Sequence, residues 1–320
     1  MSFPASWRAP ALLLALWLIW GYNWVVSKTG LHWMGALEFA VGRTVLATLT
    51  LGLILLGSRR ALAPPPWRAT LWLGLTQTTG FTGLTHLALV AGGAGKVSVL
   101  AYTMPFWTLP LAWLWLGERV RGGQWLAIGL ALLGLLAILE PWRASHTAGL
   151  PEVLALAGGV SWAASAIIAK QLRASHQVDV LALTFWQMLY GLPPLLALAW
   201  LWPGAPTAWA EPGLWLTLGF AGVFAGGIGW LMWLMLLGRL SAGAAGLNVL
   251  IIPAIAVLAA WLQLGEQPSS AECMGMALIA LALTLLALPS ATHNTQRSNL
   301  NRRQHKYAAT PSVFYEPFYT

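Results

Sequence analysis

The sequence predicts an all-α integral membrane protein with ten transmembrane helices arranged as two inverted five-helix repeats. Three observations lead to this prediction. Apolar residues make up 58% of the 320 residues and charged residues only 8%, whereas about a quarter of the residues in soluble proteins are charged. The apolar residues fall into runs of about 20 residues, the length that crosses a bilayer as a helix. A pattern in the first half of the chain also returns in the second half.

Ten apolar stretches, separated by short turns, are long enough to be transmembrane spans. Lipid offers no hydrogen bonds to the backbone, so each stretch is expected to form a helix. The first stretch, which follows Arg8, is interpreted as a span because no small-residue cleavage site of a signal peptide follows it. The expected spans are residues 11–27, 35–56, 69–90, 94–116, 122–139, 151–170, 179–202, 212–237, 242–264 and 272–289.

Lysine and arginine residues are distributed unevenly among the predicted loops. If the N-terminus lies inside, thirteen basic residues lie at inner loops and termini, and only Lys28, Lys96 and Arg143 lie outside. Cytoplasmic loops carry an excess of Lys and Arg. The sequence therefore predicts a multi-pass protein of the cell (inner) membrane with cytoplasmic N- and C-termini.

The two halves of the chain share a motif. It reads "AGKVSVLAYTMPFWTLPLAWLWLGE" from Ala94 and "AGAAGLNVLIIPAIAVLAAWLQLGE" from Ala242, and in each copy a proline precedes the glutamate by thirteen positions. Five spans per half is an odd number, so the second half must enter the membrane from the opposite face, as in the inverted repeats of secondary transporters. The polar, basic residues 290–320 are expected to form a disordered cytoplasmic tail.

These elements resemble the drug/metabolite transporter superfamily, specifically its ten-helix exporters with two EamA domains. The resemblance covers about residues 11–289 and rests on "WGYNWVVSK" from Trp20, Arg43 in the second span and the two copies of the shared motif. It implies that residues 1–140 and 146–289 are EamA-like repeats, with helices 1–5 in the first and 6–10 in the second. Lys96 and Ala244 stand where the family commonly carries arginine.

The resemblance also implies a function. Such proteins export small metabolites, often amino acids or related amphipathic compounds, across the cytoplasmic membrane by alternating access. A multidrug or other metabolite carrier, and a non-transporting membrane scaffold of the same fold, stay open as alternatives. The expected partners are a small-molecule substrate and the lipid bilayer, and the oligomeric state is open, a monomer being possible.

Polar side chains that recur on one helical face predict a substrate pathway inside the helix bundle. Thr78, Thr82 and His86 follow one another at every fourth residue, which places them on one face of a helix. Hydrogen bonding between helices is the alternative explanation for such residues. The full set of predicted pathway residues is Trp20, Asn23, Thr78, Thr82, His86, Tyr102, Trp162, Ser165, Trp186, Gln187, Trp230 and Asn248.

Two prolines and three titratable residues complete the predicted site. Pro105 and Pro253 each remove an intrahelical hydrogen bond, so a kink that exposes backbone to a cavity is expected beside each. Glu38, Arg43 and His86 lie inside predicted spans and are candidates for coupling transport to an ion gradient. For Glu38 and Arg43, pairing near the outer end of the span is the alternative.

The sequence argues against several other classes of function. No cluster of His, Cys, Asp and Glu has the spacing of a metal or catalytic site, so neither an enzyme, a metal site nor a cofactor is expected. No phosphate-binding loop of an ATP-driven pump is found. The net charge of +8 arises from basic residues scattered over the predicted inner loops, and no nucleic-acid-binding motif accompanies them.

Overall fold

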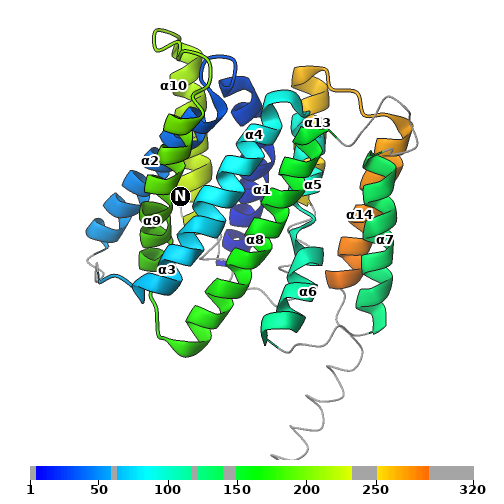
Figure 1. Ribbon diagram of the computed structural model, residues 1–320, viewed down its shortest axis with the longest axis horizontal. Helices are drawn as coiled ribbons and strands as arrows, with labels where there is room; N and C mark the ends of the chain where they lie inside the picture. The colour runs from blue at the N-terminus through cyan, green and yellow to red at the C-terminus, as the bar shows by residue number, and fades with distance from the viewer. Residues whose placement is uncertain (1–4, 59–62, 117–121, 140–148, 233–250, 288–320) are drawn as a thin grey trace, which may run out of the picture. The chain divides into compact units, whose positions relative to one another are not determined.

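The structure is a computed structural model that describes residues 5–58, 63–116, 122–139, 149–232 and 251–287. Throughout these residues every regular element is a helix (Figure 1). Residues 1–287 form one compact unit and residues 288–320 a separate one, and only the first is described. The predicted tail at 290–320 and Asn248 therefore lie outside the described residues.

The first half of the unit contains five helical stretches. The third is continuous from Trp67 to Ala91 but contains a central π-helix, η1, and the fourth is interrupted at Tyr102 and Thr103, just before Pro105. The elements are α1 (Ala5–Gly30), α2 (Ala36–Gly57), α3 (Trp67–Leu73), η1 (Gly74–Thr82), α4 (Gly83–Ala91), α5 (Ala94–Ala101), α6 (Met104–Leu116) and α7 (Gly122–Leu139).

The second half repeats this order where it is described. Pro253 lies in the first turn of the described part of α13, and Val249, whose carbonyl it is expected to free, lies outside the described residues. The elements are α8 (Leu150–Ser175), α9 (Val180–Leu201), α10 (Pro212–Gly219), the π-helix η2 (Phe220–Ile228), α13 (Ile251–Leu264) and α14 (Ser270–Ala287).

Six of these stretches are long and apolar enough to cross a membrane, and three shorter apolar helices accompany them. The stretch from Trp67 to Ala91 is not among the six, since Thr and Gln residues in η1 lower its hydropathy. The six are Ala11–Gly30, Ala36–Gly57, Ala94–Trp115, Leu150–Arg173, Val180–Leu201 and Pro212–Met232, and the shorter helices are Trp125–Ile138, Ile251–Leu264 and Ser270–Ala282. The chain is thus a multi-pass membrane protein, and the count of ten spans stays a prediction.

Large apolar side chains on the outside of the helices agree with a lipid environment. Trp200 is 82% exposed, Leu216 75% and Leu114 70%. Exposed apolar surface of this extent is unfavourable in water but is the normal outer surface of a protein in a bilayer.

The contacts between the two halves occur in matched pairs. Helix α1 packs on α13, and its counterpart α8 packs on α5 and α6. In the same way α2 packs on η2, and its counterpart α9 packs on η1. Three further contacts join equivalent helices of the two halves: α7 with α14, α2 with α9, and α5 with α13 (Figure 1). Equivalent helices of the two halves thus lie against one another.

The two π-helices occupy equivalent places in the two halves. They begin at Gly74 and Phe220, a separation of 146 residues, and both are nine residues long. A π-helix is rare and locally displaces the backbone hydrogen bonds, which is why it is often found at functional sites. Its occurrence in both halves indicates that the feature belongs to the duplicated unit.

Glycine residues let several of these helices approach closely. A Cβ atom on Gly74 of η1 would lie 2.6 Å from the carbonyl oxygen of Gln187 in α9, and one on Gly134 of α7 would lie 2.8 Å from the carbonyl oxygen of Gly275 in α14. Inside a bilayer, such contacts between small residues are a main source of helix association. Glycines also bring η2 close to α2, where a Cβ atom on Gly222 would lie 2.5 Å from Cβ of Leu46.

Candidate functional site

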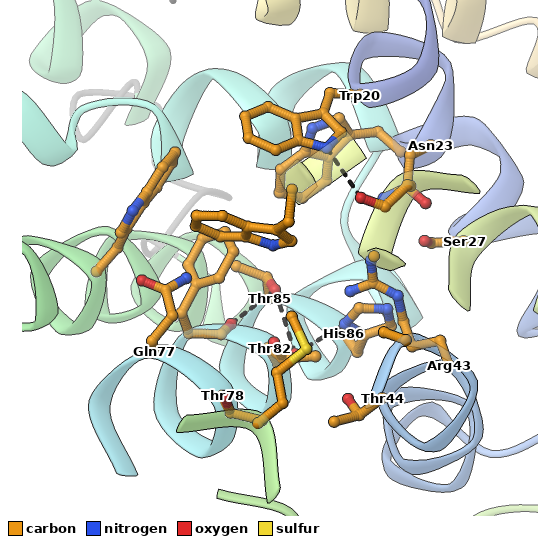
Figure 2. A pocket seen from close by; sticks show the side chains of 18 of the residues that line it. Trp20, Asn23, Ser27, Arg43, Thr44, Gln77, Thr78, Thr82, Thr85 and His86 are labelled. Atoms are coloured by element: carbon orange, nitrogen blue, oxygen red, sulfur yellow. Dashed lines mark hydrogen bonds between the residues drawn. The ribbon is translucent and has the colours of Figure 1, made fainter. Parts of the chain in front are cut away.

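A cavity lies between the helices of the two halves (Figure 2). The cavity offers a volume of about 100 Å³ to the centres of water molecules. This is several times the roughly 10–15 Å³ that one water requires by the same measure. Both halves contribute to the wall. The lining residues are Trp20, Asn23, Trp24, Ser27, Arg43, Thr44, Ala47, Gln77, Thr78, Phe81, Thr82, Thr85, His86, Leu89, Tyr102, Trp162, Met188, Ala225, Gly226 and Trp230.

The two π-helices form opposite parts of the cavity wall. From η1 come Gln77, Thr78, Phe81 and Thr82, and from η2 come Ala225 and Gly226. Carbonyl groups of η2 accept hydrogen bonds from other helices: Arg43 Nη2 donates to the carbonyl oxygen of Ala221 at 3.2 Å, and Trp20 Nε1 donates to that of Ala225 at 3.0 Å. The π-helix thereby fixes two side chains of the cavity.

Aromatic side chains form a connected wall. Tyr102 packs edge-on against Trp162 with ring centroids 5.3 Å apart, and Phe81 lies 4.9 Å from Trp162. Trp20 and Trp230 form a second edge-to-face pair at 5.5 Å. These distances and angles are those of favourable aromatic contacts. The wall is therefore rigid and apolar, and it presents ring surfaces to a ligand.

Four buried polar atoms from cavity-lining residues have no hydrogen-bond partner among the described residues: Asn23 Oδ1, Ser27 Oγ, Arg43 Nε and His86 Nε2. Figure 2 shows these four side chains on one side of the cavity and Gln77 on the other. Buried polar groups are normally hydrogen-bonded. Their convergence leaves several unpaired polar atoms on this side of the cavity.

His86 is held in one orientation by its neighbours. Its Nδ1 lies 2.7 Å from the carbonyl oxygen of Thr82, and its ring stacks on Phe39 with centroids 5.9 Å apart. A carbonyl oxygen only accepts hydrogen bonds, so Nδ1 carries the proton of that bond. In the neutral imidazole Nε2 is then an acceptor, and it is the atom without a partner.

Most of the pathway residues predicted from the sequence lie together at the cavity. Eight line it: Trp20, Asn23, Thr78, Thr82, His86, Tyr102, Trp162 and Trp230. Ser165 lies behind the wall, where its Oγ donates to Gln77 Oε1 at 2.5 Å. Asn248 lies outside the described residues.

Two predicted residues of α9 do not line the cavity. Trp186 packs against Phe185 and Tyr190. Gln187 is buried, and its backbone oxygen accepts a hydrogen bond from Thr78 Oγ1 at 3.4 Å. The rotation of α9 about its axis instead directs Met188 to the cavity, and the polarity of neighbouring residues does not reveal that rotation.

The three candidate coupling residues lie in different places. Arg43 and His86 line the cavity, whereas Glu38 does not. Glu38 Oε1 accepts a hydrogen bond from the backbone N–H of Gly204 at 2.7 Å, in the segment between α9 and α10. It therefore joins α2 to the second half of the chain.

Several lining residues were not predicted. Phe81 lies between Thr78 and Thr82, and the polar spacing of these threonines gave no reason to select an apolar residue. Thr44 directly follows Arg43 and was not selected with it. Ala47 and Ala225 have neither a polar nor an aromatic side chain that would single them out in the sequence.

A second group of polar contacts explains the shared Leu-Gly-Glu motif. Helix α13 ends at Leu264, and Gly265 has a φ of 67°, a left-handed conformation that favours glycine. The chain thereby turns Glu266 towards α5. Its carboxylate accepts hydrogen bonds from the backbone N–H groups of Ala94 at 2.6 Å and Gly95 at 3.1 Å, two of the donors that a helix N-terminus leaves unpaired.

Two lysine residues make further polar contacts near α5, and those of Lys96 join the two halves. Lys96 of α5 pairs with Glu152 of α8 at 3.0 Å and with Glu272 of α14 at 2.8 Å. Lys28 donates to the carbonyl oxygens of Leu89 at 2.5 Å and Gly92 at 3.0 Å. We refer to Glu266, Lys96, Glu152 and Glu272 as the charged clasp. The equivalent residues Glu118 and Ala244 of the other copies lie outside the described residues.

Comparison with known proteins identifies the family. The profile of the EamA-like transporter family matches the chain twice, over residues 7–140 and 150–288. The chain belongs to the EamA-like transporter family. This EamA protein is accordingly a membrane transporter of the drug/metabolite transporter superfamily, as its resemblance to that superfamily indicated.

Individual relatives of this EamA protein span nearly the same length. It is 27% identical over 276 residues to the uncharacterized transporter YoaV of Bacillus subtilis (strain 168), covering 85% of this chain and 94% of the relative. It is 29% identical over 282 residues to a probable amino-acid metabolite efflux pump of Escherichia coli (strain K12), covering 85% and 92%. A protein of known crystal structure shares the fold with a TM-score of 0.61 at 19% identity, over 87% of this chain and 96% of that one.

Proposed function

We propose that this EamA protein exports small metabolites, amino acids or related amphipathic compounds, across the inner membrane by alternating access. The observation that carries the proposal is the cavity between the two halves, which combines an aromatic wall with unpaired polar groups. Ligand sites of small molecules have this composition, mostly apolar with a few polar groups that set orientation. The similarity to a probable amino-acid metabolite efflux pump of Escherichia coli supports the same class of substrate.

The proposed mechanism uses two inverted repeats, at residues 1–140 and 146–289, with both termini in the cytoplasm. The matched contacts between the halves and the equivalent π-helices support a shared five-helix unit. In inverted-repeat transporters the binding site lies at the interface of the repeats, and rocking of one repeat against the other exposes it to each side in turn. The position of the cavity between the halves agrees with this mechanism.

Of the three candidate residues, His86 is the one best placed to couple transport to a proton gradient. Among the three, Arg43 and His86 line the cavity, and imidazole is the side chain that ordinarily changes charge between pH 5 and 8. Glu38 is engaged by the backbone of Gly204 outside the cavity. Export driven by a pH gradient is therefore expected to lose its pH dependence in His86→Gln but not in Glu38→Gln. Equal pH dependence in His86→Gln and wild type rejects the assignment.

Transport by the purified protein tests the proposal. The full chain is reconstituted in liposomes, and efflux of a mixed pool of labelled amino acids is measured for wild type, Trp162→Ala and Trp200→Ala. Trp162 lines the cavity, and Trp200, 82% exposed, serves as a matched control. Saturable efflux that falls at least tenfold in Trp162→Ala and is unchanged in Trp200→Ala is expected.

Other outcomes separate the alternatives. Flux that does not saturate and is not stimulated by substrate on the opposite side indicates a channel. Efflux of drug-like cations but of no amino acid indicates a multidrug carrier. The absence of flux for every compound class, with a folded protein, indicates a scaffold and overturns the exporter proposal.

A further inference from the structure

We propose that Arg43 binds the carboxylate of the transported compound, and that Asn23 and His86 beside it accept hydrogen bonds from the ammonium group of the same molecule. The inference rests on the proposed export function and narrows it to one substrate class, α-amino acids in their zwitterionic form. It is carried by a cationic side chain without an acidic partner among the described residues and by two acceptor atoms without a hydrogen-bond partner there, all on the same side of the cavity.

Arg43 has most of its hydrogen-bonding capacity free. A guanidinium group has five N–H donors. The structure shows one hydrogen bond from it, from Nη2 to the carbonyl oxygen of Ala221 at 3.2 Å, and the buried Nε has no partner among the described residues. The donors that remain point towards the cavity near Ser27 and His86 (Figure 2).

Acidic residues of the described chain do not neutralise this charge. None of them lines the cavity. Glu266 binds the N-terminus of α5, Glu152 and Glu272 pair with Lys96, and Glu38 binds Gly204. A buried cation without a counterion is costly, and charged residues within membrane spans mark ligand pathways for that reason.

The geometry of the free donors matches a carboxylate. The planar fork of a guanidinium binds both carboxylate oxygens at once, and this pairing is stronger than a hydrogen bond between neutral groups. An ammonium group needs acceptors, and the two unpaired atoms Asn23 Oδ1 and His86 Nε2 are acceptors. The aromatic wall, with Phe81 and Trp162, then faces the side chain of the amino acid.

A structural role for Arg43 predicts a different behaviour. If Arg43 served only to hold α2 to η2 through Ala221, its replacement would lower stability and leave ligand selectivity unchanged. A ligand-binding role predicts that the replacement changes ligand selectivity and does not lower stability. Without ligand, Arg43→Gln removes an uncompensated charge and is expected to unfold at the same temperature as wild type or higher.

The test measures binding to the full-length protein in detergent micelles, by the shift in unfolding temperature. The probes are the twenty α-amino acids and, for each one that binds, the corresponding amide, which lacks the carboxylate, and the corresponding acid without the amino group. The variants are Arg43→Gln, Arg43→Lys and Asn23→Ala. Arg68→Gln is the control, because Arg68 is exposed and lies over the ring of Trp67 outside the cavity.

Wild type is expected to bind the amino acid more tightly than either analogue. Arg43→Gln should weaken amino-acid binding about 10- to 100-fold, the range for a hydrogen bond to a charged group, and leave binding of the amide unchanged. Arg43→Lys should retain part of the affinity, and Asn23→Ala should weaken binding of compounds that carry an ammonium group. Equal selectivity for carboxylate over amide in Arg43→Gln and wild type overturns the proposal.

Binding in detergent and efflux from liposomes, measured on the same variants, together separate this inference from the proposed function. Efflux of amino acids from liposomes that is the same in wild type, Arg43→Gln and Arg43→Lys leaves the exporter standing and rejects the role of Arg43. Binding of amino acids that depends on Arg43, without efflux from liposomes, supports the site and rejects export. If no amino acid binds wild type, the proposal is overturned whatever else the protein transports.

Discussion

The carboxylate of Glu266 should control the opening of the N-terminus of α5. It accepts hydrogen bonds from the backbone N–H groups of Ala94 and Gly95, and both residues are buried, Ala94 completely. Glu266→Ala leaves these two donors without a partner and removes a negative charge from the positive end of a helix. The expected result is local opening of α5 without unfolding of the whole protein.

The magnitude follows from the two hydrogen bonds. A hydrogen bond to a charged group contributes about 1.5–3 kcal/mol, and Glu266 is half-buried, so water replaces part of this contribution after the substitution. A loss of about 1.5–3 kcal/mol for the pair corresponds to roughly 10- to 100-fold faster opening-limited exchange, at 1.4 kcal/mol for each factor of ten. Glu266→Gln, which keeps a neutral acceptor, should give a smaller increase.

Hydrogen–deuterium exchange of the purified protein measures this effect at the amides of Ala94 and Gly95. Glu152→Gln is the matched control, since it removes a carboxylate of the charged clasp that binds Lys96 and not the backbone of α5. Exchange at the two amides should be the same in Glu152→Gln and wild type. Unchanged protection in Glu266→Ala, or equal acceleration in both variants, would refute the reasoning.

Three further predictions concern stability, each measured by thermal unfolding in detergent. Gly134→Ala should destabilise by about 1–3 kcal/mol through overpacking against α14, whereas Gly129→Ala, with no atom within 4 Å of the added methyl group, should not destabilise; equal shifts would contradict the proposed packing. Lys96→Met should cost about 0.5–2 kcal/mol for two partly exposed ion pairs, and this cost should shrink in high salt. Asp179→Ala should cost about 0.5–2 kcal/mol, because the Asp179 carboxylate caps α9 at the N–H groups of Leu181 and Ala182, and Asp179→Asn should restore most of it.

In the third span, helical spacing was enough to predict which polar residues face the interior of the protein. Spacing alone placed Thr78, Thr82 and His86 on one helical face, and all three line the cavity. The stretch contains a π-helix, so its residues do not follow the regular helical period throughout. The three residues nevertheless face the interior, because a polar face must avoid lipid and the interior offers it partners, and their role in a substrate pathway stays a prediction.

Helix α9 shows where the same reasoning fails. Trp186 and Gln187 were predicted to face the substrate pathway, yet Met188 is the residue of α9 that lines the cavity. Helix α9 also makes a close backbone contact with η1, where Gly191 lies against Gly74. A close backbone contact of this kind outweighs the polarity of a single side chain, and no local pattern reports it.

The sequence by itself determined that this protein spans a membrane, is helical and carries two related halves of the EamA type, because composition, run length and repeated motifs are properties of the chain alone. Only the tertiary structure decided that Arg43, Asn23 and His86 face one cavity and that Glu266 binds the N–H of Ala94, 172 residues away. Those pairings depend on how each helix is rotated and on which helix lies beside it. Packing between distant segments sets both.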